Sequence, residues 1–255
     1  MKSKGGVVRV RENKEGRERF VEIDGCILYA HIVGEKGNHP TVIMDAGYGD
    51  YSKAWKKIIP ELSELTEVVM YDRAGLGGSE SSSNERTSEK MMIELKEMLV
   101  KLNVKPPYVL VGHSFGGVNM RLFATEYEDE VAGLILIDST HEDYRERFLP
   151  TMSLEFRDAY QKQFIHEGSY DEFMESLKQM KQKRRKLTIP LVVLCAGNKA
   201  HYSADSQLLW NEMQRELLAL SEDSTFTLAT NSAHYIQHDE PEVVIHTIKK
   251  MVRSF

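Results

Sequence analysis

Short apolar runs rich in β-branched residues recur along the chain, separated by longer segments with helical patterning. Each run is too short for a helix, and most are apolar throughout rather than alternating. Such runs are typical of strands in a parallel sheet that is covered on both faces. The alternation therefore predicts an α/β fold with an open, doubly wound, mostly parallel sheet and right-handed crossovers. The five central runs are TVIMDAG (41–47), EVVMYD (67–72), YVLVG (108–112), GLILID (133–138) and PLVVLCAG (190–197).

Further runs near the two ends of the chain extend this sheet. RFVEIDG and CILYAHIVG follow one another and predict a β-hairpin that turns at Asp24-Gly25. STFTLAT adds a last strand, so we expect about eight strands in all. The amphipathic segment PEVVIHTIKKMVRSF predicts a final helix that starts at Pro241.

One interval is too long for a single crossover helix. Almost fifty residues separate GLILID from PLVVLCAG, and they are mostly helical in pattern and rich in Met, Phe and Tyr. We interpret residues 140–187 as a helical cap inserted after the sixth strand. The core domain would then consist of residues 1–139 and 188–255.

The basic run KQMKQKRRK (178–186) lies at the end of that interval. Ser169 and Glu172 match the S-x-x-E capping box, which predicts a helix start with acidic residues in its first turn. The basic residues then lie at the far end of the same helix, where the macrodipole favours them. We therefore interpret the run as a helix end rather than as a patch for nucleic acid or lipid.

Composition narrows the class of protein. The chain has 255 residues, 41% hydrophobic and 28% charged, a composition that indicates neither a disordered nor a fibrous protein. Its net charge of −6 disfavours nucleic acid as a partner. The polar first twenty residues lack the apolar core of a signal peptide, and no apolar run is long enough to span a membrane. Cys26 and Cys195 lie in strand-like runs and are expected to be buried free thiols. We expect a cytoplasmic protein, either monomer or dimer.

The stretch GHSFG (112–116) places a lone serine between glycines. The strand YVLVG runs directly into it and a helical pattern runs directly out. A serine at such a strand-to-helix corner has a strained backbone, and its hydroxyl projects above the carboxyl edge of the sheet. A hydroxyl is a poor nucleophile until a base removes its proton. Ser114 is therefore a candidate nucleophile, and a base should lie near the same edge.

His234 is the candidate base. It lies in TNSAHYIQHDEP, on the loop between the last strand and the last helix, where it can face Ser114 because strand ends on one edge converge. The other eight histidines lie near the hairpin, in or near the cap, next to the serine, or past the loop. They are His31, His39, His113, His141, His166, His201, His238 and His246.

Three motifs in this order resemble the α/β-hydrolase fold superfamily: YDRAGLGGS, YVLVGHSFGG and NSAHYIQHDEPEVV. The chain looks most similar to the small serine hydrolases with a helical cap, over nearly its whole length from about residue 20. The resemblance implies a Ser–acid–His triad, an oxyanion hole formed by two backbone N–H groups, and no cofactor or metal.

The resemblance also places the two oxyanion donors. One is the N–H of Phe115, directly after the nucleophile, and the other comes from the loop AGYGDY, with Tyr48 as the expected donor. Members of the family often carry His-Gly where this chain has Ala46-Gly47. The change costs little because the donor is a backbone group.

The acid of the triad has two candidate positions. In much of the superfamily it follows a glycine in G-x-x-D after the capped strand, but here Ala200 occupies that place and Asp205 is the next acid. The other known position is the end of the preceding strand, where GLILIDSTHED carries Asp138. We favour Asp138, with Asp205 as the alternative and Asp143 as a third. An acid there can orient the imidazole of the base.

Asp72 and Arg73, in YDRAGLGGS, are also conspicuous charged residues. We interpret them as holding that loop by hydrogen bonds and an ion pair rather than as taking part in the chemistry.

These residues predict a serine hydrolase that cleaves a small, apolar carboxylic ester. A carbon–carbon bond hydrolase would share the triad, whereas dehalogenation and epoxide opening use an Asp nucleophile that this corner lacks. A small-molecule receptor on the same fold is the alternative from another class. Flexible Met and flat rings suit an apolar chain, and the candidate pocket residues are Gly47, His113, Met152, Phe156, Tyr160, Phe164, Phe173 and Tyr235.

Overall fold

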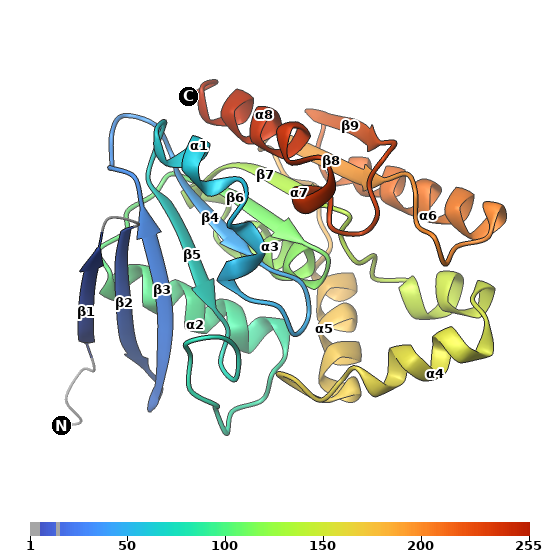
Figure 1. Ribbon diagram of the computed structural model, residues 1–255, viewed down its shortest axis with the longest axis horizontal. Helices are drawn as coiled ribbons and strands as arrows, with labels where there is room; N and C mark the ends of the chain where they lie inside the picture. The colour runs from blue at the N-terminus through green and yellow to red at the C-terminus, as the bar shows by residue number, and fades with distance from the viewer. Residues whose placement is uncertain (1–5, 14–15) are drawn as a thin grey trace.

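The computed structural model describes residues 6–13 and 16–255, which form a nine-stranded sheet flanked by helices (Figure 1). The strand order is β1-β2-β3-β5-β4-β6-β7-β8-β9. Strands β4 to β9 run parallel, and β1 to β3 form an antiparallel extension that joins β5. The predicted mostly parallel α/β sheet is confirmed. The strands are β1 (Val7–Asn13), β2 (Gly16–Ile23), β3 (Cys26–Val33), β4 (Thr41–Asp45), β5 (Val68–Asp72), β6 (Tyr108–His113), β7 (Val131–Ile137), β8 (Leu191–Ala196) and β9 (Ser224–Ala229).

Strand β1 is missing from the sequence prediction. Its segment VVRVREN lies at the edge of the sheet and pairs with β2, and Val7, Val8 and Val10 are exposed. An edge strand with two solvated faces has no buried side to produce an apolar signal. The helical insertion therefore follows the seventh strand of the chain rather than the sixth.

The apolar runs are strands because helices cover both of their faces. Every residue of β4, β5, β6 and β7 is buried. Successive residues point to opposite faces, so Val109 and Leu110 of β6 belong to different core clusters. One face packs against α2 (Ser88–Lys101) and α3 (Phe115–Glu126), and the other against α1 (Ile59–Ser63) and α8 (Pro241–Val252).

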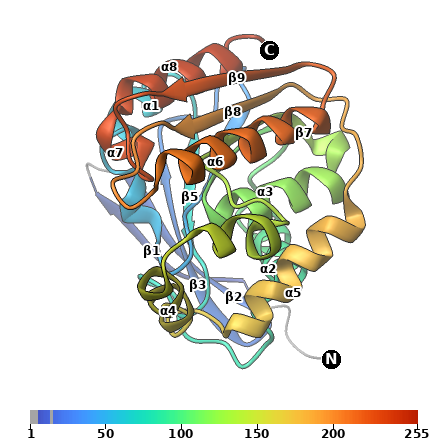
Figure 2. The ribbon, with the colours of Figure 1, turned by 90° about the vertical axis from the view of Figure 1, so that its right-hand side faces the viewer.

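The segment between β7 and β8 is helical, and we call residues 144–183 the cap segment. Figure 2 shows it beside α6 (Ala204–Glu216). The apolar residues of its first half pack with Trp210 and Met213 of α6. The capping box at Ser169 and Glu172 is present as predicted. The cap segment consists of a π-helical turn (Tyr144–Phe148), a 3-10 turn (Leu149–Thr151), α4 (Leu154–Lys162) and α5 (Tyr170–Lys183).

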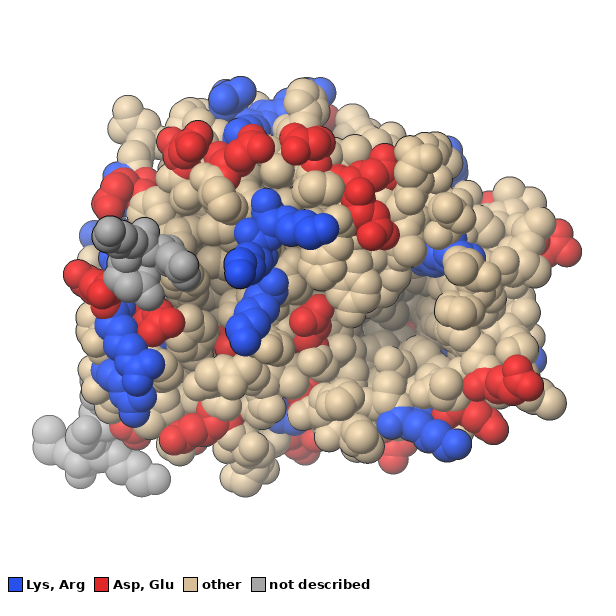
Figure 3. Space-filling view, viewed as in Figure 1, with Lys and Arg blue, Asp and Glu red and all other residues tan. Residues whose placement is uncertain are grey.

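The basic run at the end of α5 is paired with acids. Lys181 contacts Asp143, and Arg184 contacts Glu142. Over the face seen in Figure 3, acidic and basic side chains are interspersed, and the surface is recessed between the sheet and the cap segment.

Cys26 and Cys195 are buried and free, as expected. Within the described part of the chain, no helix is both long and apolar enough to span a membrane.

Candidate active site

Ser114 stands at a backbone corner that leaves no room for larger neighbours. It directly follows β6 and occupies the N-cap position of α3 with φ 52° and ψ −119°, a backbone conformation that residues other than glycine rarely adopt. A Cβ on Gly112 would lie 2.5 Å from the carbonyl oxygen of Gly116, and one on Gly116 would lie 2.2 Å from that of Asp45. The two glycines of the motif are therefore required by the close approach of three backbone segments.

The same corner exposes the serine alone. His113 and Phe115 are fully or almost fully buried, whereas Ser114 between them is half-buried. The N–H of Ser114 donates to the carbonyl oxygen of Ile137 at 3.0 Å, which ties the corner to the end of β7. The strained turn thus presents one side chain, bearing a hydroxyl, at the carboxyl edge of the sheet.

His234 is held in place from two sides. Its Nδ1 lies 2.6 Å from Oδ2 of Asp138, and its carbonyl oxygen accepts a hydrogen bond from Nε2 of His113 at 2.9 Å. The rings of His113 and His234 lie 4.6 Å apart between centroids. These contacts place His234 next to His113, the residue that directly precedes Ser114. The Nδ1 hydrogen bonds to the carboxylate, which leaves Nε2 of His234 as the nitrogen that can accept a proton.

Asp138 is fully buried at the end of β7 and is bonded on both of its oxygens. Oδ1 accepts hydrogen bonds from Nε1 of Trp210 at 2.7 Å and from the N–H of Ala196 at 3.1 Å. Oδ2 contacts His234 and Nζ of Lys199, each at 2.6 Å. We call Asp138, His234, Lys199 and Trp210 the base cluster.

The base cluster keeps the carboxylate ionised. Burial by itself would raise the pKa of Asp138, but the positive charge of Lys199 and the hydrogen bond from His234 hold that pKa well below its usual range. An ionised Asp138 can stabilise the imidazolium that forms when His234 takes a proton.

The two other candidate acids lie elsewhere. Asp205 is exposed in the first turn of α6, after the helix cap Ser203. Asp143 occupies the position just before the π-helical turn of the cap segment and pairs with Lys181. The structure brings Asp138 to His234 and leaves both of these carboxylates in positions that suit helix ends.

The glycine loop after β4 packs against the serine. A Cβ on Gly47 would lie 3.4 Å from Cβ of Ser114 and 3.2 Å from Nδ1 of His113. The rings of Tyr48 and Phe115 lie 5.9 Å apart. Within the residues that the structure describes, the N–H groups of Tyr48 and Phe115 have no hydrogen-bond acceptor. The loop thus brings the free N–H of Tyr48 toward the corner that carries Ser114 and the free N–H of Phe115.

A second buried charge cluster supports this glycine loop. It consists of Arg73, Asp45 and Glu167, and we call it the loop cluster. Arg73 donates to the carbonyl oxygens of Ala46 at 2.8 Å and Gly47 at 2.7 Å, and it also contacts Asp45. The planar guanidinium fork suits such multiple bonding. The arginine therefore fixes the backbone on which the predicted oxyanion donor lies.

The loop cluster also joins the cap segment to the core. Glu167 lies between α4 and α5, and its two oxygens accept hydrogen bonds from Arg73 at 2.6 Å each. One of them also accepts from the N–H of Gly49 at 2.8 Å, and the hydroxyl of Tyr48 donates to the carbonyl oxygen of Gly168. Movement of this part of the cap segment would break bonds to the glycine loop.

Asp72 behaves as predicted, whereas Arg73 does not share its role. The carboxylate of Asp72 accepts hydrogen bonds from the N–H groups of Ser52 and Gly78, each at 2.8 Å, which holds the YDRAGLGGS loop. The ion pairs of Arg73 go to the loop cluster instead. Sequence alone could not identify Glu167 as a partner because 94 residues separate it from Arg73.

The predicted pocket residues divide into three groups. Phe164 and Phe173 are buried and lie 4.9 Å and 5.8 Å from the ring of Tyr48, and Tyr160 packs on both of them. Met152 and Phe156 pack instead with the cluster around Trp210. Gly47, His113 and Tyr235 lie beside His234 or Ser114, where His113 is fully buried and Tyr235 is exposed.

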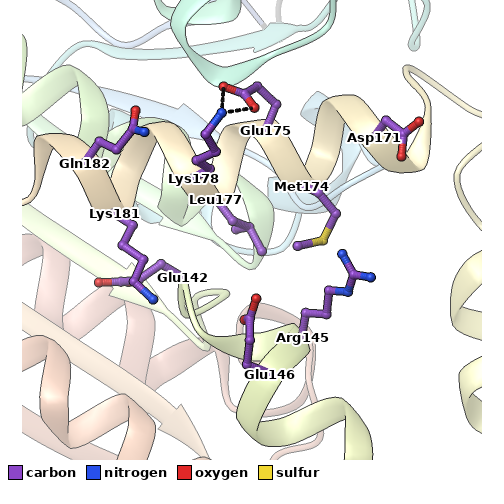
Figure 4. A pocket seen from close by; sticks show the side chains of 10 residues that line it. All are labelled: Glu142, Arg145, Glu146, Asp171, Met174, Glu175, Leu177, Lys178, Lys181 and Gln182. Atoms are coloured by element: carbon purple, nitrogen blue, oxygen red, sulfur yellow. Dashed lines mark hydrogen bonds and ion pairs between the residues drawn. The ribbon is translucent and has the colours of Figure 1, made fainter.

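Two cavities occur away from Ser114. One of about 600 Å³ lies between residues 142–146 and α5 (Figure 4). Its wall carries mixed charges, including the ion pair of Lys178 with Glu175, and only Met174 and Leu177 are apolar. The other, of about 360 Å³, lies between residues 74–86 and residues 164–169. Neither cavity is lined by Ser114 or His234, and Phe164 is the one predicted pocket residue in the wall of the second.

Comparison with known proteins identifies the family of the chain. A family model described as the alpha/beta hydrolase fold matches residues 40–238. The chain belongs to the α/β-hydrolase fold family. The uncharacterized protein YqjL from Bacillus subtilis (strain 168) is 34% identical over 230 residues, which cover 89% of this chain and 88% of that protein.

Two solved structures share the fold over most of the chain. Cfl2 from Burkholderia cenocepacia superposes with a TM-score of 0.72 at 19% identity, covering 96% of this chain and 99% of that one. The meta-cleavage product hydrolase CumD from Pseudomonas fluorescens IP01 gives a TM-score of 0.64 at 16% identity, covering 90% and 95%. At such identities the likeness concerns the fold.

Proposed function

We propose that this α/β hydrolase is a serine hydrolase that cleaves a small, apolar carboxylic ester with Ser114, His234 and Asp138. The contact between His234 and Asp138, 2.6 Å from Nδ1 to Oδ2, carries the proposal. It supports the role of His234 as a base that an ionised acid orients, and the strained corner at Ser114 supports the role of that serine as nucleophile.

Each residue has one role in the proposed reaction. Oγ of Ser114 attacks the ester carbonyl carbon while Nε2 of His234 takes its proton. The C–O bond to the alcohol then breaks, and the alcohol leaves with that proton, so that the acyl group stays on Ser114. Water, deprotonated by His234, attacks the acyl-enzyme, and the carboxylic acid leaves as Ser114 regains its proton. Asp138 stabilises the imidazolium in both steps.

The N–H groups of Tyr48 and Phe115 are the proposed oxyanion donors. Both are free within the described residues, and the loop cluster fixes the backbone of the first. Such donors act on charge that develops in the transition state, and losing one typically costs about 3 kcal/mol. The rings of Phe164 and Phe173 over Tyr48 support an apolar acyl or alcohol group.

Activity and active-site labelling test this proposal together. The wild type should hydrolyse p-nitrophenyl esters with a burst and react with a fluorophosphonate probe, and a series of acyl chain lengths should reveal its preference. Ser114→Ala should do neither, because it lacks the nucleophile. Ser83→Ala, which alters an exposed serine on the loop before α2, is the matched control and should behave as the wild type. A wild type that binds the esters but is not labelled would favour a receptor instead.

Cleavage of a carbon–carbon bond is the second candidate. CumD, which shares this fold, is described as a meta-cleavage product hydrolase. The same three residues could serve that reaction. Turnover of a meta-cleavage product, with no turnover of esters in the series, would favour it.

A further inference from the structure

Lys199 occupies an unusual position for a lysine. It lies on the loop after β8 and its side chain is only 6% exposed. Its Nζ lies 2.6 Å from Oδ2 of Asp138, the same oxygen that Nδ1 of His234 contacts at 2.6 Å. Nζ also lies 3.7 Å from the ring centroid of Trp210 and 4.8 Å from that of Tyr202. The lysine therefore shares one carboxylate oxygen with the candidate base.

The surroundings of Lys199 bear on its charge. Burial lowers the pKa of Lys199, and the neighbouring carboxylate of Asp138 opposes that effect. The two aromatic faces favour a cation at this place. A buried charge of this kind is costly unless it is paired, so a lysine here needs Asp138 as its partner.

We propose that Lys199 is a positioning residue that shares Asp138 with His234 and thereby limits how strongly the carboxylate stabilises the imidazolium. The inference rests on the proposed function, because it concerns the base of that reaction. Oδ1 is already bonded to Ala196 and Trp210, so Oδ2 is the oxygen on which the two groups meet. With Lys199 present, Asp138 orients the imidazole while part of its charge is neutralised.

The sign of the effect follows from Coulomb's law. A positive charge beside Asp138 disfavours a second positive charge on His234. His234 must be neutral to act as base, so Lys199 extends activity toward lower pH. Removing its charge should make the imidazole harder to deprotonate, and the acidic limb of the pH–rate profile should move to higher pH.

Other titratable groups around the two side chains do not explain such a shift. Burial, with the charge of His234, lowers the pKa of His113 to about 3, and burial beside Asp138 raises the pKa of Cys195 to about 12. Burial also raises the pKa of each neighbouring tyrosine, and His238 stacks on one of these rings. These last groups are Tyr144, Tyr202, Tyr235 and His238.

A titration of His234 by NMR tests the inference without turnover. The full chain is labelled with ¹⁵N and ¹³C, and the imidazole signals are assigned with His234→Gln and His238→Gln. In Lys199→Met the midpoint of the His234 titration should rise by about one pH unit relative to wild type. Lys199→Arg keeps the charge and should keep the wild-type midpoint. Equal midpoints in wild type and Lys199→Met would overturn the inference.

Two additions make the result decisive. Lys199→Gln removes the charge but keeps a hydrogen-bond donor, so it replaces methionine if that variant does not fold, with the same expected rise. The rate of fluorophosphonate labelling against pH should show its acidic midpoint shifted upward to the same extent. A lysine that only anchors the loop would lower stability and leave both midpoints unchanged. A wild type that is never labelled would contradict the proposed function, while the NMR midpoints would still decide the role of Lys199.

Discussion

Two buried charge clusters flank Ser114, and they differ in how their cation is bonded. In the loop cluster, Arg73 makes hydrogen bonds to two carboxylates and two carbonyl oxygens. In the base cluster, Lys199 has a single ion pair among the described residues, on an oxygen shared with His234. The planar guanidinium of Arg73 fixes the backbone of the glycine loop. The ammonium of Lys199 acts as a point charge near the imidazole of His234, which can gain or lose a proton.

This difference suits the two sides of the proposed reaction. An oxyanion hole works because its donors are held still before the charge develops. A base must change its protonation state during each turnover, so the groups around it have to accept both states. We therefore expect substitutions in the loop cluster to lower kcat and the free energy of unfolding. Substitutions in the base cluster should in addition change the pH dependence of the rate.

The largest effect is expected when the carboxylate of the base cluster is removed. Asp138→Asn should lower kcat by a factor on the order of 10⁴, because an amide cannot stabilise the imidazolium or hold its tautomer. The variant also leaves Lys199 buried and unpaired, so the free energy of unfolding should fall by about 3–5 kcal/mol. Steady-state kinetics and urea denaturation measure the two effects.

Asp205→Asn is the matched control for that substitution. The side chain is exposed in the first turn of α6, so activity should be unchanged and stability should change by less than about 0.5 kcal/mol. An active Asp138→Asn together with an inactive Asp205→Asn would reverse the assignment of the acid.

The loop cluster gives the next largest effect. Arg73→Met leaves two carboxylates buried without a cation, so stability should fall by about 3–5 kcal/mol. The loss of support for the carbonyls of Ala46 and Gly47 should lower kcat by about 10²-fold, with a smaller change in KM.

Arg73→Lys separates charge from geometry in the same cluster. Lysine keeps the positive charge but loses the fork, so kcat should fall by about tenfold. If this variant were as active as the wild type, charge alone would suffice in the loop cluster, and the contrast with the base cluster would fail.

The sequence predicts the parts of the fold that depend on burial and on local turns. The central strands are recognisable because both faces are covered, and the corner at Ser114 because only glycine fits around it. Strand β1 is not predicted from the sequence because its valines are exposed. The pattern of apolar residues along a strand reflects which of its faces are buried, and an exposed edge strand therefore gives only a weak pattern.

Partners that meet across the fold are harder to predict from the sequence. Asp138 could be proposed because strand ends converge on one edge. Lys199 lies in GNKA, where the resemblance draws attention only to the acid missing at Ala200. Glu167 belongs to the cap segment, whose placement on the core depends on packing between distant residues. Charge clusters of this kind carry no spacing that a sequence pattern could reveal.

The smallest effect concerns His113, which supports the base side through the carbonyl oxygen of His234. Burial, with the charge of His234, lowers the pKa of His113 to about 3, whereas an unfolded histidine has a pKa near 6.5. Between these values the unfolded state binds more protons, so the stability due to neutral His113 is present above pH 6.5 and is lost as the pH falls toward 3.

His113→Gln keeps a donor for that carbonyl but cannot titrate. The free energy of unfolding from urea melts at pH 6.5, 5.5 and 4.5 should therefore fall less steeply in the variant, by at most about 1.4 kcal/mol per pH unit. Parallel slopes would mean that His113 is protonated while the protein is folded, and the base side would then tolerate a charge that its buried geometry opposes.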